Sequence, residues 1–187
     1  MQILSGRFLG RLTCLAAVFL AAASSMSGQV MFSAVASKAV FAPGERIAIR
    51  LTLRNQGKKQ VLISDLTLGT VTVTSFQRDG KNIAGRKTEI NLDDELGAAL
   101  IRSLKPLTTN QSITADWRSM TDPKLAGQAL QTAQYVQSGL PIGTLYPANV
   151  PGVYRVSIQY HLPAVPGAPA TAFSGKTNVA SFQFQIK

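Results

Sequence analysis

The only histidine of the chain, His161, is the first candidate for chemistry, because imidazole serves as a general base or a metal ligand. A typical zinc site needs several histidine or cysteine ligands, and the only cysteine is Cys14, far away in the sequence. A serine nucleophile on a G-x-S-x-G turn is also missing from the sequence. We therefore predict that His161 is a solvent-facing strand residue and not a catalytic one.

Asp93, Asp94 and Glu95 form the one cluster of acidic residues. Their spacing lacks the alternation and the central glycine of a calcium-binding loop. Carboxylates in this position are typical of the first turn of a helix, where they interact favourably with the helix dipole. The sequence also lacks a glycine-rich phosphate loop and a dinucleotide fingerprint. We therefore expect no catalytic residue, no metal site and no cofactor.

The N-terminal residues read as a secretory signal peptide. Arg7 and Arg11 form a basic region, and the apolar run Leu12–Ala23 is too short to span a membrane. We predict a signal peptide over residues 1–26, with cleavage between Ala23 and Gln29, and a domain over residues 27–187 without a further membrane span. The expected location is the periplasm or the cell exterior. The alternative is an uncleaved N-terminal anchor.

The charge of the chain is strongly positive and dispersed. Removing Arg7 and Arg11 from 19 basic residues leaves 17 against nine acidic ones, a formal net charge of +8. Cys14 would leave with the signal peptide, so stability must come from a core and not from disulfides. The basic residues are not interleaved with aromatic ones, as a stacking surface for nucleic acid would require. We expect a protein or an anionic envelope polymer as partner, and no nucleic acid.

Two alternating stretches indicate the fold. Both Ile47–Leu53 and Tyr154–Leu162 place apolar residues at every second position, as in half-buried strands. A proline–glycine pair precedes each of them, which is typical of a turn. Further strands are expected at about residues 31–37, 60–64, 71–77, 111–117 and 180–187, with an Asp-Gly hairpin signal at residues 79–80. Short strands at close spacing favour an antiparallel sandwich.

The middle of the chain departs from this pattern. In residues 91–104, acids are followed by Leu96, Leu100 and Leu104 at helical spacing, which predicts a short helix. A second helix is predicted over residues 121–139, with a loop as the alternative. The Pro/Gly/Ala-rich stretch Pro163–Asn178 is expected to be a mobile loop that joins the last two strands as a long hairpin.

The motifs "FAPGERIAIRLTLRNQ" and "VPGVYRVSIQY", with the closing "VASFQFQI", resemble bacterial secreted immunoglobulin-like modules. The resemblance implies an all-β, antiparallel immunoglobulin-like sandwich, here with a helical insertion. Such modules accompany exported peptidases and occur in proteinase-inhibitor-like proteins. The resemblance also implies structural roles for the turn residues Pro43, Gly44, Pro151 and Gly152, and a tyrosine corner at Tyr154.

These observations favour a non-enzymatic binding or accessory module. We expect recognition by the two helical inserts or by the loop after residue 162, because sandwich proteins usually carry recognition on loops. The candidate contact residues are Arg102, Trp117, Tyr135 and Lys176, although Trp117 fits a buried anchor better than a ligand platform. Three alternatives remain: a proteinase inhibitor that presents residues 163–175, an uncharacterised hydrolase, and a module that adds a strand to a partner's sheet.

Overall fold

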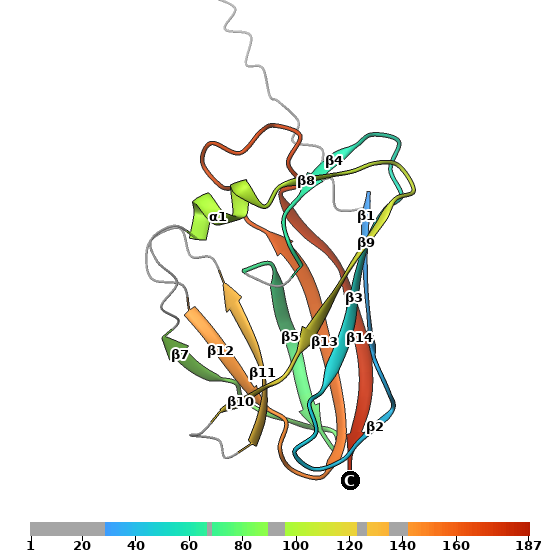
Figure 1. Ribbon diagram of the computed structural model, residues 1–187, viewed down its shortest axis with the longest axis vertical. Helices are drawn as coiled ribbons and strands as arrows, with labels where there is room; N and C mark the ends of the chain where they lie inside the picture. The colour runs from blue at the N-terminus through green and yellow to red at the C-terminus, as the bar shows by residue number, and fades with distance from the viewer. Residues whose placement is uncertain (1–28, 67–68, 90–95, 123–126, 135–141) are drawn as a thin grey trace, which may run out of the picture.

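The computed structural model describes residues 29–66, 69–89, 96–122, 127–134 and 142–187. They form an antiparallel immunoglobulin-like β-sandwich with one short helix, α1 (Leu96–Arg102), as the sequence predicts (Figure 1). The predicted signal peptide and the acidic cluster at residues 93–95 lie outside the described residues. Within the described part of the chain, no helix combines the length and the apolar character that crossing a bilayer requires.

The five-stranded sheet, here called the back sheet, contains the predicted long hairpin of the last two strands. Its strand order is β2 (Val40–Phe41), β14 (Gly175–Ile186), β13 (Gly152–Leu162), β5 (Val71–Arg78) and β6 (Lys81–Asn82). β13 pairs antiparallel with both β14 and β5, whereas β2 runs parallel to β14. Alternate residues of β13 are buried and turn toward the core. The Asp79–Gly80 turn between β5 and β6 has positive φ at both residues, as the hairpin signal predicts.

The front sheet has the order β1 (Val30–Ala36), β3 (Ala48–Asn55) and β9 (Ser112–Arg118). Ile49, Leu51 and Leu53 of β3 are fully buried, so the period-two pattern does mark the core face. A side chain of the back sheet forms hydrogen bonds with the open edge of β1. The amide of Asn178 accepts a hydrogen bond from Phe32 N (2.8 Å) and donates one to Phe32 O (2.9 Å).

A third sheet contains the described part of the segment predicted as a helix over residues 121–139. That prediction was wrong for residues 121–122 and 127–134, which are strands, and its other residues lie outside the described ones. The order is β10 (Met120–Asp122), β11 (Gly127–Gln134), β12 (Ile142–Pro147) and β7 (Arg86–Glu89). Ser119 lies between β9 and β10, and its hydroxyl accepts a hydrogen bond from Ile47 N (2.8 Å). β11 is paired along both of its edges, with β10 and with β12. These backbone hydrogen bonds outweigh the weak helical preference of the segment. Local sequence patterns do not show such pairings, so they could not identify β11 as a strand.

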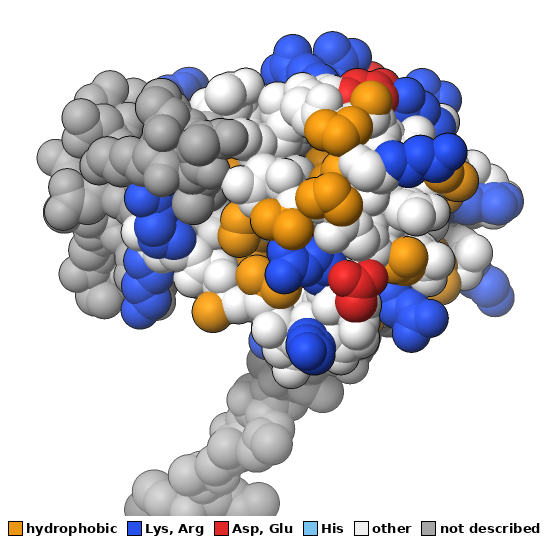
Figure 2. Space-filling model, turned by 90° about the horizontal axis from the view of Figure 1, so that it is seen from below, with side chains coloured by type: hydrophobic (Ala, Val, Ile, Leu, Met, Phe, Trp, Pro, Cys, Tyr) orange, Lys and Arg blue, Asp and Glu red, His pale blue; other side chains and the backbone are white. Residues whose placement is uncertain are grey.

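A small two-stranded sheet, β4 (Val61–Ile63) with β8 (Lys105–Leu107), lies at one end of the sandwich beside α1 and the β13–β14 loop (Figure 1). The predicted helix over residues 91–104 is confirmed for Leu96–Arg102. The opposite pole, seen in Figure 2, carries Lys and Arg side chains spread among apolar ones and a few acids. This view agrees with the dispersed charge of the sequence.

Gly44 and Gly152 both have positive φ, and Tyr154 is fully buried. Glu45 N donates to Ala42 O (3.1 Å), and Gly44 between them has φ of +75°, as in a type II turn. Gly152 has φ of +148°, and a Cβ there would lie 2.7 Å from Asp79 Oδ2. Pro43 and Pro151 immediately precede these two glycines. The fully buried Tyr154 donates its hydroxyl proton to Val150 O (2.7 Å), which confirms the tyrosine corner.

Candidate functional site

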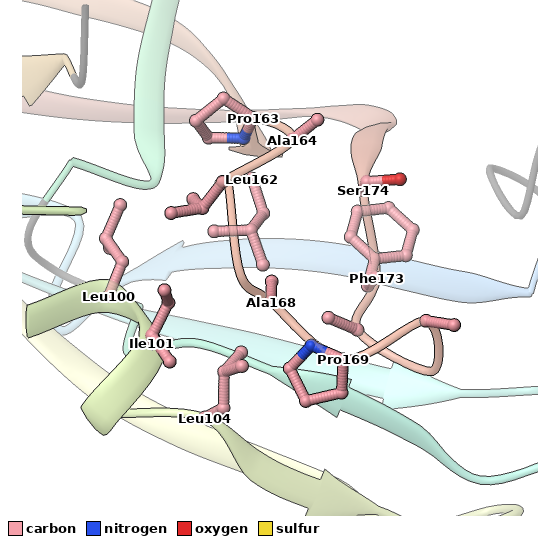
Figure 3. A pocket seen from close by; sticks show the side chains of 13 residues that line it. Leu100, Ile101, Leu104, Leu162, Pro163, Ala164, Ala168, Pro169, Phe173 and Ser174 are labelled. Carbon is pink, nitrogen blue, oxygen red and sulfur yellow. The ribbon is translucent and has the colours of Figure 1, made fainter. Parts of the chain in front are cut away.

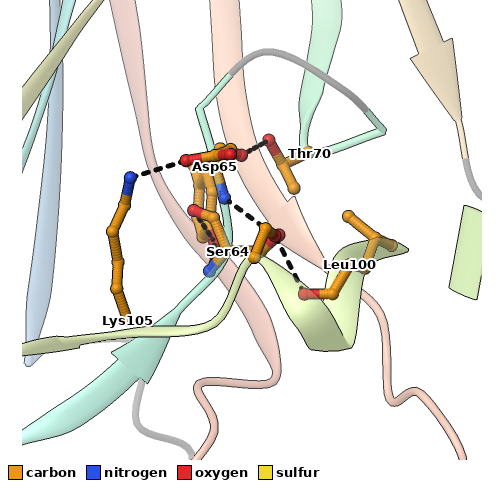
Figure 4. A network of polar contacts seen from close by, with 7 residues as sticks. Ser64, Asp65, Thr70, Leu100 and Lys105 are labelled. Atoms are coloured by element: carbon orange, nitrogen blue, oxygen red, sulfur yellow. Dashed lines mark hydrogen bonds and ion pairs between the residues drawn. The ribbon is translucent and has the colours of Figure 1, made fainter. Parts of the chain in front are cut away.

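The position of α1 is fixed by a network of polar contacts at its C-terminal end (Figure 4). The Ser103 hydroxyl donates to Leu100 O (2.9 Å) and contacts the Ser64 hydroxyl directly. Beside it, Lys105 Nζ lies 2.6 Å from Asp65 Oδ1, and the Thr70 hydroxyl donates to Asp65 O (2.6 Å). The helix is therefore joined to the residues that follow β4.

The buried hydroxyl of Tyr160 extends this support into the core. It accepts a hydrogen bond from Ser64 N (3.1 Å) and donates to Ser64 O (3.3 Å). Burial raises the pKa of the Tyr160 phenol far above its ordinary value, so the hydroxyl remains protonated. The end of β4 is thereby fixed to the back sheet.

The loop from Pro163 to Ser174 is packed against this scaffold, so the expectation of a mobile loop over 163–178 needs correction. Phe173 is fully buried, with its ring centroid 5.9 Å from that of Tyr160. Backbone bonds join Leu62 N to Thr171 O (3.0 Å) and Phe173 N to Leu62 O (2.7 Å). Moreover, β14 already begins at Gly175. A single aromatic anchor and two strand-like bonds thus order a segment rich in Pro, Gly and Ala.

An apolar pocket of about 160 Å³ lies between α1 and this loop (Figure 3). Except for Ser174, every side chain that lines it is apolar. The principal ones are Leu100, Ile101, Leu104, Leu162, Pro169 and Phe173. The exposed residues Ala164 and Ala170 mark its opening to solvent. A cavity of about 150 Å³ with such a lining accommodates a benzene ring, so this pocket fits one leucine- to phenylalanine-sized group.

His161 lies in a second, polar hollow of about 290 Å³ on the outer face of the back sheet. The sequence predicted a solvent-facing side chain, whereas His161 is half-buried in this hollow. The other lining residues are Gly69, Thr72, Thr74, Gln159, Pro163 and Lys176. Burial and, to a lesser degree, the Lys176 ammonium lower the pKa of His161 below its ordinary value. None of the described residues that line the hollow carries a carboxylate that could orient His161 as a general base.

The structure separates the predicted contact residues. Trp117 is only 6% exposed and donates its indole N–H to Gln131 O (2.9 Å), so it is an anchor between β9 and β11. Arg102 is exposed in the last turn of α1, near the apolar pocket. Lys176 is exposed at the polar hollow, directly opposite His161 in the β13–β14 ladder. Tyr135 lies outside the described residues.

The apolar pocket and its two main non-helical walls, Leu162 and Phe173, could not be predicted from the sequence. The one usable signal was Phe173 itself, because a lone large aromatic residue in a Pro/Gly/Ala-rich stretch needs a place to be buried. Among the described residues, no group of three or more His, Cys, Asp or Glu side chains is arranged to hold a metal ion.

Comparison with known proteins adds little to this geometry. No family model and no curated protein matches the sequence. Among solved structures, the chain is similar to the CARDB domain of the PF1109 protein from Pyrococcus furiosus in complex with di-metal ions, with 9% identity, a TM-score of 0.36, and coverage of 84% of this chain and 91% of that one. A PapD-like domain of human CEP192 gives 11% identity, a TM-score of 0.35, and coverage of 100% and 98%.

A third similar structure is AvmM, which catalyses macrocyclization in alchivemycin A biosynthesis, at 11% identity, a TM-score of 0.36, and coverage of 84% and 88%. Because all three TM-scores lie below 0.5, they support no inference about activity. The assignment of the fold therefore rests on the strand order of the chain itself.

Proposed function

We propose that this chain is an exported, non-enzymatic binding module that holds a protein partner through one apolar side chain. The observation that carries the proposal is the apolar pocket between α1 and the Pro163–Ser174 loop. Its size suits a single side chain and not a whole metabolite, which commonly needs 300 Å³ or more. Export is proposed from the signal peptide predicted at residues 1–26.

The pocket would act as the anchor point of a larger contact. Burying one leucine or phenylalanine side chain contributes about 1.5–3 kcal/mol, a factor of roughly 10 to 200 in affinity. Such anchors usually dominate an interface and are surrounded by contacts of small individual effect. The exposed Arg102 and the exposed rim residues Ala164 and Ala170 are placed to supply those contacts.

The proteinase-inhibitor alternative is less favoured by the geometry. An inhibitory loop presents an extended segment to the enzyme, whereas Thr171–Phe173 are bonded to β4 and Phe173 is fully buried. The exposed tip at Pro166 and Gly167 lies in a turn closed by a bond from Ala168 N to Val165 O (3.1 Å), so it is not extended either. Inhibition of a panel of peptidases by the intact chain would favour this alternative over the anchor pocket.

The anchor pocket can be tested without knowing the partner. Methyl NMR spectra of Leu100, Ile101 and Leu104 would be recorded with N-acetyl-leucinamide and N-acetyl-phenylalaninamide, for which the expected burial corresponds to a Kd between about 6 and 80 mM. We expect concentration-dependent shifts confined to the pocket, and their loss in Ala168→Leu, which fills it. Ala39→Leu adds the same isopropyl group at an exposed position just before β2 and serves as the matched control.

The same variants connect the pocket to a partner in the cell envelope. A photo-crosslinking residue at Ala170 should yield a discrete product that disappears in Ala168→Leu and persists in Ala39→Leu. If neither model amide shifts the pocket methyl groups, or if Ala168→Leu leaves the shifts unchanged, the proposal is wrong. Mass spectrometry of the exported chain tests cleavage between residues 23 and 29.

A further inference from the structure

The outer face of the back sheet carries an ordered array of polar side chains. At its centre, Ser157 of β13 lies opposite Ser181 of β14 and Ser75 of β5, and the hydroxyls of Ser157 and Ser181 are 2.8 Å apart. Serine side chains are short, so this row is the floor of a shallow depression of about 440 Å³. A ligand that lies across the row can therefore approach the backbone of the sheet closely.

Positive groups stand at both ends of this floor. Arg155 is flanked by Gln77 and Gln183 in the neighbouring strands, and its Nε donates to Gln183 Oε1 (3.1 Å). At the other end, Lys176 and His161 face each other across the β13–β14 ladder. Six residues separate Arg155 from His161, which places the two ends about 20 Å apart along the strand.

No acidic side chain faces outward from the described residues of β5, β13 and β14. The outward positions are Thr72, Thr74, Ser75 and Gln77 of β5; Val153, Arg155, Ser157, Gln159 and His161 of β13; and Lys176, Val179, Ser181, Gln183 and Gln185 of β14.

Asp79, in the turn after β5, is the nearest acid by sequence, and its carboxylate accepts a hydrogen bond from Val153 N (2.8 Å). Three further described acids form ion pairs elsewhere on the surface. Lys38 binds Glu45, Lys105 binds Asp65, and Arg118 binds Asp116. For Lys176, in contrast, no ion pair occurs within the described part of the chain. Arg155 likewise forms no ion pair with a described acid, and its Nε donates to Gln183 instead.

We propose that this face binds a linear, non-aromatic polyanion that lies along β13, with one anionic group at Arg155 and another at the Lys176–His161 end. The proposal is independent of the apolar pocket, which opens at the end of the sandwich. Arg155 suits a phosphate or carboxylate because its planar fork donates two parallel bonds, and Lys176 acts as a point charge. No outward position on the three strands carries an aromatic ring on which a nucleobase would stack.

His161 would respond to the bound anion. Its neighbours in the hollow are the ammonium of Lys176 from β14, the neutral Thr72 and Thr74 from β5, and the amide of Gln159. An anion placed between Lys176 and His161 offsets the repulsion from the ammonium and favours the imidazolium form. Binding should accordingly be accompanied by proton uptake at His161 and should strengthen as the pH falls from 7 to 5.

The test compares two double variants of equal charge. Arg155→Gln with Lys176→Gln removes both cationic ends, whereas Arg54→Gln with Lys58→Gln removes one arginine and one lysine from exposed positions at β3 and the turn after it. Fluorescence anisotropy would measure binding to labelled polyphosphate, polygalacturonate and oligo(dT) from 50 to 300 mM salt. Circular dichroism verifies that the exposed substitutions preserve the fold.

We expect the Arg155/Lys176 variant to lose on the order of 50-fold in affinity at 50 mM salt and about 2 in the slope of log K against log salt. The Arg54/Lys58 variant should lose only a few-fold. Polyphosphate and polygalacturonate distinguish phosphate from carboxylate as the anion, and tight binding of either one supports the site. Equal losses in both variants would mean that net charge alone binds. Equal losses would overturn the proposal. It would also be overturned if oligo(dT) bound more tightly than both other polymers, or if none of the polymers bound.

Discussion

Replacing Asn178 by alanine tests how the two layers of the sandwich are closed. The Asn178 amide supplies both hydrogen bonds that Phe32 makes at the open edge of β1, at 2.8 and 2.9 Å. In Asn178→Ala, the N–H and C=O of Phe32 lose these partners, although the Phe32 side chain stays buried. At about 1 kcal/mol for each bond, the free energy of unfolding should fall by about 2 kcal/mol.

Urea denaturation measures this loss directly. With a slope of about 2 kcal/mol per molar for a domain of this size, the midpoint should fall by about 1 M while the slope stays unchanged. Val179→Ala is the matched control, because the neighbouring side chain is 49% exposed and its truncation should cost less than about 0.5 kcal/mol. Hydrogen exchange should show faster exchange of the Phe32 amide in the Asn178 variant alone.

The reasoning would be refuted by a midpoint in Asn178→Ala that equals that of Val179→Ala. It would also be refuted by a destabilised variant in which the Phe32 amide keeps its protection, because the loss would then arise somewhere other than the bridge. Asn178→Asp retains an acceptor for Phe32 N but loses the donor for Phe32 O, so it should lie between the wild-type chain and the alanine variant.

Three further predictions follow from the structure. Phe173→Ala should lower the free energy of unfolding by about 3–5 kcal/mol and speed hydrogen exchange in the loop after β13; an unchanged melting temperature would contradict the anchoring role. NMR titration should place the pKa of His161 below 6.5, because burial and Lys176 disfavour the imidazolium, and Lys176→Gln should raise this pKa. The small contribution of neutral His161 to folding stability is present above about pH 6.5 and is lost as the pH falls through the lower folded pKa. A pKa at or above 6.5 would be inconsistent with this environment. Tyr154→Phe should cost about 1–3 kcal/mol in thermal or urea unfolding, since Val150 O loses its 2.7 Å bond; wild-type stability would show that the corner is not needed.

Much of the fold could be predicted from local patterns in the sequence. The alternation in β3 and β13 identified their core faces, because side chains of a strand point to opposite sides of the sheet. The Asp79–Gly80 turn and the Tyr154 corner were likewise predictable, since each depends on residue types close together in the chain. The helix α1 was also predictable, because the spacing of its apolar residues is a local pattern.

Tertiary structure decided the parts that depend on distant partners. Residues 127–134 form a strand because β10 and β12 flank them on both edges, and the sequence alone cannot reveal such long-range pairs. The loop after β13 is ordered by Leu62, about 110 residues earlier in the chain. The apolar pocket arises only where α1 and this loop come together, and the acid-free face only where three strands align. Local periodicity thus determined which face of each strand is buried. The apolar pocket and the acid-free face, in contrast, depend on which elements lie next to each other in the folded chain.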